Sequence, residues 1–73
     1  MDYHAQFRLA NDPEASQETL ERLSRSSFEL IRGAVASNPN TGEKTLLYLA
    51  LDSSSHVIEN LMANSKYGDI RSV

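Results

Sequence analysis

The residue types that could perform acid–base or nucleophilic chemistry are few in this sequence and are not spaced as an active site. The two histidines, His4 and His56, stand near opposite ends of the chain. His56 follows a serine run at residues 53–55, but a Ser–His pair without an organised acid or oxyanion donor does not make a nucleophile, and serines at a helix start are ordinary caps. We therefore expect no catalytic residue and no enzymatic activity.

Residues that could hold a metal or a cofactor are equally scarce. The sequence has no cysteine, which excludes disulfides, thiolate zinc sites and iron–sulfur clusters. A site built from His4, His56 and carboxylates would need a convergence of distant residues that no spacing in the sequence indicates. We expect no metal site and no cofactor.

The segment TGEKT, residues 41–45, approaches two ligand-binding motifs and completes neither. It is similar to a linker between zinc fingers, which has meaning only between pairs of Cys and His ligands. A phosphate-binding loop requires G-x-x-x-x-G-K-[ST]. Here Glu43 separates Gly42 from Lys44, and Ser37 stands where the first glycine should be. The segment therefore predicts neither a zinc finger nor a nucleotide site.

Three arginines form a candidate anion-binding patch: Arg22, Arg25 and Arg32. A solvated, ion-paired surface is the preferred explanation of these residues, because acidic residues lie within about one helical turn of them, namely Glu18, Glu21 and Glu29. The formal net charge of -3 repels a polyanion on average, which disfavours nucleic acid as the main partner. Backbone-directed nucleic-acid binding through this patch is the alternative function.

Location follows from the apolar pattern of the chain. No apolar run approaches the roughly 18 residues that a membrane span needs, and the start MDYHAQF lacks the basic and apolar regions of a secretion signal. We expect a cytoplasmic protein without a membrane partner.

An internal repeat sets the expected organisation of the chain. A shift of 26 residues produces six identities: Ala10 with Ala36, Pro13 with Pro39, Thr19 with Thr45, Leu20 with Leu46, Leu23 with Leu49, and Ser27 with Ser53. We expect a single helical-repeat domain over residues 1–73, with the second helix of a partial repeat at 1–9, repeats at 10–35 and 36–61, and a degenerate cap at 62–73. A chain of 73 residues without disulfides must be stabilised by regular packing or self-association.

Each full unit is predicted to contain two helices. In the first unit, Ser16 or Ala15 opens a helix through Arg25 and the second helix covers residues 26–37; in the second unit the helices cover 42–51 and 54–63. The turn NPNT ends one helix, and Thr41 is predicted to cap the next, which begins at Gly42. Ser26 and Glu29 have the spacing of a capping box. Asp52 or Ser53 is the expected cap of the last of these helices.

The segment IRGAVASNPNTGEKTLLYLALD, residues 31–52, resembles the leucine-rich repeat variant family. The matching positions are Ile31, Arg32, Val35, Ala36, Asn38, Pro39, Asn40, Thr41, Leu46, Leu49, Ala50 and Asp52, continued more loosely by Val57, Leu61, Ala63 and Asn64. The resemblance implies an all-α fold: a short right-handed α-solenoid of about two and a half repeats, with α-helices alternating with shorter, partly 3₁₀ helices. It implies no activity. The iron–sulfur segment of some members is not carried over, since cysteine is absent, and Gly42 replaces the usual proline.

The predicted core consists of apolar residues at equivalent phases of the repeat: Leu9, Leu20, Leu23, Ile31, Val35, Leu46, Leu49, Val57 and Leu61. Four other apolar residues are Leu47, Tyr48, Leu51 and Ile58, and they occupy the phases at which the first unit has Glu21, Arg22, Arg25 and Arg32. Positions that are charged in one unit ordinarily face solvent. We therefore expect these four residues to form a surface for a protein partner or a second copy.

An alternative explanation of this apolar set is that the tail from Ser65 to Val73 folds back over part of it, through Tyr67, Ile70 and Val73. The preferred function is a non-enzymatic protein–protein interaction module that presents a helical-repeat surface.

Overall fold

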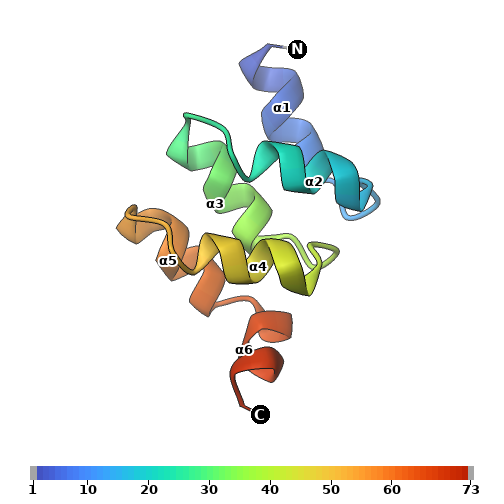
Figure 1. Cartoon of the computed structure of the whole chain (residues 1–73). Coiled ribbons are helices and arrows are strands. Elements are labelled where there is room, and N and C mark those ends of the chain that lie inside the picture. The colour runs from blue at the N-terminus through green and yellow to red at the C-terminus, as the bar shows by residue number, and fades with distance from the viewer. Residues whose placement is uncertain (1, 73) are drawn as a thin grey trace.

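The computed structural model describes residues 2–72, and these residues form only helices and turns (Figure 1). The helices are α1 (Tyr3–Ala10), α2 (Gln17–Leu23), α3 (Glu29–Ser37), α4 (Glu43–Leu49), α5 (Ser55–Met62) and α6 (Ser65–Arg71). The all-α expectation is confirmed. None of these helices is long and apolar enough to cross a membrane over the described residues.

The first five helices keep the 26-residue spacing of the sequence. Helices α1, α3 and α5 begin at residues 3, 29 and 55, and α2 and α4 begin at 17 and 43. Helix α3 packs against α1 on one side and against α5 on the other, while α2 and α4 run in the same direction across the view in Figure 1. Helix α6 begins at residue 65, earlier than the spacing would place it, and packs against α4 and α5.

The short helices α2 and α4 are α-helical rather than 3₁₀. Their amides bond four residues back, as the Leu20 N–H does to the Ser16 carbonyl at 3.0 Å. Only their ends tighten to three-residue bonds, such as that from the Arg25 N–H to the Arg22 carbonyl at 3.1 Å. Three-residue bonds also end α1, α3 and α5, as from the Asn64 N–H to the Leu61 carbonyl at 3.0 Å, so the 3₁₀ character implied by the family resemblance does not distinguish α2 and α4.

The core is the one that helical periodicity predicts. Eight of the nine predicted core residues are buried, and the ninth, Leu9, is half-buried and packs against them. Small residues, Ala10, Ala34 and Ala36, are also buried and allow the helices to approach one another closely. The core predictions are confirmed because one apolar stripe per helix faces its neighbours.

Asn38 joins the first full unit to the second through a buried hydrogen-bond cluster. Its Nδ2 donates to the Ala10 carbonyl at 2.8 Å and to the Asp12 carbonyl at 2.9 Å, and its Oδ1 accepts from the Asn40 N–H at 2.8 Å. Its side chain is only 3% exposed. The asparagine therefore supplies a donor to the Ala10 carbonyl and a second donor to the Asp12 carbonyl, which also accepts from the Ala15 N–H at 3.1 Å.

Asn64 repeats this arrangement one unit further along the chain. Its Nδ2 donates to the Ala36 carbonyl at 2.8 Å and to the Asn38 carbonyl at 3.2 Å, and its Oδ1 accepts from the Lys66 N–H at 2.9 Å. The same side chain thus performs the same task at residues 38 and 64, so the sequence repeat is also a repeat of tertiary contacts.

The predicted role of Thr41 as a helix cap is wrong. The cap of α4 is Gly42, which makes no side-chain cap bond, and its N–H instead donates to Gln17 Oε1 at 2.8 Å. Thr41 is fully buried, and its hydroxyl donates to the Val35 carbonyl at 2.7 Å. The Val35 carbonyl, near the end of α3, thus accepts both from this hydroxyl and from the Asn38 N–H at 3.1 Å.

Two further capping predictions are also wrong. Ser26 and Glu29 do not form a capping box, because α3 is capped by Phe28 and Ser26 Oγ accepts from the Phe28 N–H at 3.1 Å. The cap of α5 is Ser54 rather than Asp52 or Ser53, and Ser54 Oγ accepts from the Val57 N–H at 3.4 Å. Asp52 lies two residues earlier and pairs with a distant arginine instead.

Replacement of Thr41 by valine, which keeps the shape and removes the hydroxyl, is expected to lower the free energy of unfolding by about 1 kcal/mol. Urea unfolding followed by circular dichroism measures the change. Thr19→Val is the matched control, because the Thr19 hydroxyl accepts only from the neighbouring Ser16 hydroxyl at 2.9 Å on an exposed surface. Equal stabilities of the Thr41→Val variant and the wild type would contradict the expectation.

Candidate functional site

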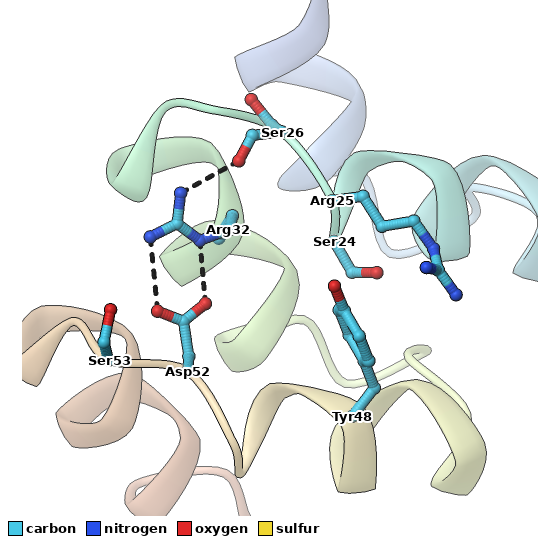
Figure 2. Close-up of a pocket in the computed structure, with 7 residues that line it drawn as sticks. All are labelled: Ser24, Arg25, Ser26, Arg32, Tyr48, Asp52 and Ser53. Carbon is cyan, nitrogen blue, oxygen red and sulfur yellow. Dashed lines mark hydrogen bonds and ion pairs between the residues drawn. The ribbon is translucent and has the colours of Figure 1, made fainter.

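An open polar pocket of about 300 Å³ lies where the turns after α2 and α4 meet α3 (Figure 2). We call it the polar pocket, and its lining residues are Ser24, Arg25, Ser26, Arg32, Tyr48, Asp52 and Ser53. These residues come from both full units. Of the candidate residues expected from sequence, the pocket brings together Arg25, Arg32 and Tyr48, whereas Arg22, Leu47, Leu51 and Ile58 do not line it.

Arg32 is held in the wall of the polar pocket by an ion pair that sequence reasoning missed. Its Nε donates to Asp52 Oδ2 at 2.7 Å, its Nη2 donates to Asp52 Oδ1 at 3.2 Å, and its Nη1 donates to the Ser26 carbonyl at 2.9 Å. The two side chains are only 19% and 9% exposed. This paired, side-on geometry is the strong form of a charge-assisted hydrogen bond.

The pair shifts the pKa of both groups. Hydrogen bonding from the Arg32 guanidinium lowers the pKa of the Asp52 carboxyl below its usual value, more than burial raises it, and the Ser54 N–H adds to the effect. Hydrogen bonding to Asp52 raises the pKa of Arg32 in turn. Both groups are therefore charged at neutral pH, and Asp52 offsets the charge of Arg32.

The acidic residues near the arginines in sequence have other partners. Glu21 lies 3.4 Å from Lys44 Nζ in an exposed ion pair, and a Glu29 carboxylate oxygen accepts from Ser54 Oγ at 2.8 Å. Within residues 2–72, neither Arg22 nor Arg25 has a carboxylate within ion-pair distance. Of the three arginines, only Arg32 forms an ion pair among residues 2–72, and its partner is Asp52 of the next unit rather than a neighbouring glutamate.

Arg25 and Tyr48 meet at the edge of the polar pocket. The Arg25 guanidinium carbon lies 4.7 Å from the centre of the Tyr48 ring, which is the geometry of a cation–π contact. Figure 2 shows the Tyr48 hydroxyl directed toward Ser24, whose own hydroxyl donates to the Glu21 carbonyl at 2.6 Å. The contact positions a charged and an aromatic side chain together at the surface.

An apolar surface adjoins the polar pocket on α4 and the turn after it. Leu47 is 46% exposed, Tyr48 is 43% exposed and Leu51 is 83% exposed. We call these three residues the α4 patch. Ile58, the fourth residue predicted for this surface, is half-buried and packs against the core, so it is not part of the α4 patch.

Helix α6 covers the core rather than Leu51. Tyr67 and Ile70 are half-buried and pack against the core, while Leu51 keeps most of its surface in solvent. Val73, the third residue of the proposed cover, lies outside the described residues. The described part of the tail therefore leaves the α4 patch open.

A second, less polar pocket of about 230 Å³ lies over α1, α3 and α5. Its lining residues are Phe7, Asn11, Leu30, Ala34, Ser37, His56 and Asn60. Sequence reasoning missed this pocket, although the 26-residue shift pairs Leu30 with His56, Asn11 with Ser37, and Ala34 with Asn60. Because paired positions have the same phase of the repeat, these pairs could have indicated that their side chains lie on one face of the molecule.

The two histidines do not meet in a site. His56 lies in the second pocket with its Nε2 3.3 Å from Asn60 Nδ2, while His4 is exposed beside the Tyr3 ring. Over residues 2–72, no group of three or more His, Asp or Glu side chains could hold a metal ion. The candidate site is therefore the polar pocket with the adjoining α4 patch.

Comparison of the chain with protein-family models, with curated proteins and with solved structures found no match.

Proposed function

We propose that this chain is a non-enzymatic protein-interaction module that presents the α4 patch to a protein partner. The observation that carries the proposal is the position of Leu51, 83% exposed beside two other exposed apolar side chains. Full burial of a leucine side chain is worth about 1.5–3 kcal/mol, so covering this residue would contribute substantially to binding. A cluster of exposed apolar residues marks an interface more often than isolated ones do.

The scaffold that we propose for this surface is a short right-handed α-solenoid of about two and a half units, of the leucine-rich repeat variant type. Two observations support it: the 26-residue spacing of α1, α3 and α5, and the equivalent hydrogen bonds of Asn38 and Asn64. A stiff stack of this kind holds the patch in place before binding, so little ordering entropy is lost when a partner docks.

Nucleic-acid binding through the arginines is the less supported function. The Arg32 guanidinium already forms an ion pair with Asp52, and the net charge of the chain is -3. A phosphate backbone would have to displace that carboxylate, so the proposal rests on a protein partner instead.

Leu51→Glu is expected to reduce partner capture from an extract of the source cells at least about tenfold, because a charge would be buried against apolar surface. Leu30→Glu is the matched control, since Leu30 is 48% exposed on α3 and lies outside the α4 patch. Light scattering across a concentration series shows whether the partner is a second copy. A monomer whose capture is unaffected by Leu51→Glu would contradict the proposal.

A further inference from the structure

We propose that the polar pocket binds one carboxylate of the partner that docks on the α4 patch, so that the partner carries an acidic side chain beside apolar ones. This inference rests on the proposed function and names the chemistry of the partner. Tyr48 belongs to both surfaces, because it lines the polar pocket and is exposed in the α4 patch. A ligand in contact with Tyr48 therefore reaches apolar and polar surface together.

The charge of the polar pocket favours a single negative charge. Two guanidinium groups, Arg25 and Arg32, and one carboxylate, Asp52, give it a net charge of +1 in a chain whose formal net charge is -3. Asp52 accepts three hydrogen bonds, since Oδ1 accepts from Arg32 and from the Ser54 N–H, and Oδ2 accepts from Arg32. The remaining positive charge is that of Arg25.

Three hydrogen-bond donors at the pocket have no acceptor among residues 2–72. They are the Arg25 guanidinium, which makes a cation–π contact with the Tyr48 ring, and the hydroxyls of Tyr48 and Ser53. A carboxylate supplies acceptor sites on two oxygens, and charge-assisted bonds to it are stronger than neutral ones. These exposed donors and the positive charge therefore favour the same kind of ligand, one that is negatively charged and offers several acceptor atoms.

A carboxylate fits this setting better than a phosphate group does. A phosphate monoester carries about −1.5 to −2 charges at neutral pH, which exceeds the net charge of the pocket, and Asp52 repels that charge more strongly than it repels the single charge of a carboxylate. The apolar neighbours Leu47 and Leu51 also require apolar ligand atoms, which an acidic peptide supplies beside its carboxylate. The observations therefore favour an acidic, leucine-rich peptide segment as the occupant.

The test is an NMR titration of the full chain with the blocked tripeptide Leu-Glu-Leu and its isosteric counterpart Leu-Gln-Leu. The acidic peptide is expected to bind about tenfold more tightly, as the loss of one charge-assisted contact implies. It should shift the amide signals of Ser24, Ser53 and Tyr48. Arg25→Gln should abolish the difference between the two peptides. Arg22→Gln is the matched control, since Arg22 is exposed in α2, three residues before Arg25, but does not line the pocket.

Each other outcome overturns the inference in a recognisable way. Equal affinities of the two peptides, with shifts at Leu47 and Leu51 only, would show that the polar pocket does not bind the carboxylate, although the α4 patch still binds apolar side chains. Tighter binding of inorganic phosphate than of Leu-Glu-Leu would show that the polar pocket prefers a phosphate group to a carboxylate. Failure of millimolar Leu-Glu-Leu to shift any pocket signal would also overturn it. The proposed function fails separately, when Leu51→Glu leaves partner capture unchanged.

Discussion

Replacement of Asn38 by alanine is expected to lower the free energy of unfolding by about 3 kcal/mol, at about 1 kcal/mol for each of three lost hydrogen bonds. The Ala10 and Asp12 carbonyls would lose their side-chain donor, and the Asn40 N–H would lose its acceptor. A domain of this size rarely has more than about 3–5 kcal/mol of stability, so much of the population should unfold at room temperature. Thermal unfolding by circular dichroism measures the loss.

The matched control for this variant is Asn11→Ala. Asn11 is exposed and its Nδ2 makes one local bond, to the Phe7 carbonyl at 2.9 Å, so its loss should cost less than about 0.5 kcal/mol. Asn38→Asp keeps the shape but turns a carboxylate oxygen toward two carbonyls, and it should be at least as destabilising as alanine at neutral pH. A loss below about 1 kcal/mol for both Asn38 variants would show that the cluster does not hold the units together.

Asp52→Asn is expected to lower the free energy of unfolding by about 2 kcal/mol at neutral pH, because two charge-assisted bonds from Arg32 are lost or weakened. The asparagine Oδ1 can still accept from the Ser54 N–H, so the change isolates the ion pair. Urea unfolding of both proteins at pH 7 measures the difference.

The pH dependence of this difference follows from the lowered pKa of Asp52. A carboxyl whose folded-state pKa lies below its ordinary value of 3.8 contributes stability that is complete above that value. The contribution is lost as the pH falls through the folded-state pKa. The gap in stability between wild type and Asp52→Asn should therefore be constant above that window and close within it.

The matched control for the ion pair is Glu21→Gln, which removes the exposed contact with Lys44. The Lys44 side chain is 86% exposed, so this pair should contribute little that is measurable, and salt should screen what there is. Equal losses for Asp52→Asn and Glu21→Gln would show that the burial of the Arg32–Asp52 pair has no energetic consequence.

The fold was predictable to the level of helices and core because its signals are local. Leu46 and Leu49 recur at helical spacing, and Pro39 cannot continue a helix from the residues before it, so neither signal depends on the rest of the chain. The caps were less predictable. Thr41 and Ser54 are the same kind of residue at a helix boundary, yet one hydroxyl is buried against a carbonyl of the preceding helix and the other caps.

The candidate site was predictable only in part. A comparison of the two units identified Leu47, Tyr48 and Leu51, because a position that holds a charged residue in one unit faces solvent in both. All three residues are exposed. For Arg32 the sequence indicated ion pairing with nearby glutamates, which is not the pairing that the structure has. Its partner, Asp52, is 20 residues away in the next unit, at a position that local spacing does not connect to it.

The sequence by itself determined the helical content, the 26-residue period and the apolar stripes that form the core, because each depends on residues within one or two helical turns. Only the tertiary structure decided which polar groups pair between units. The Asn38 bonds to Ala10 and Asp12 span 28 and 26 residues, and such contacts exist only once the helices have stacked. The polar pocket is a consequence of that stacking, since its walls come from two successive units.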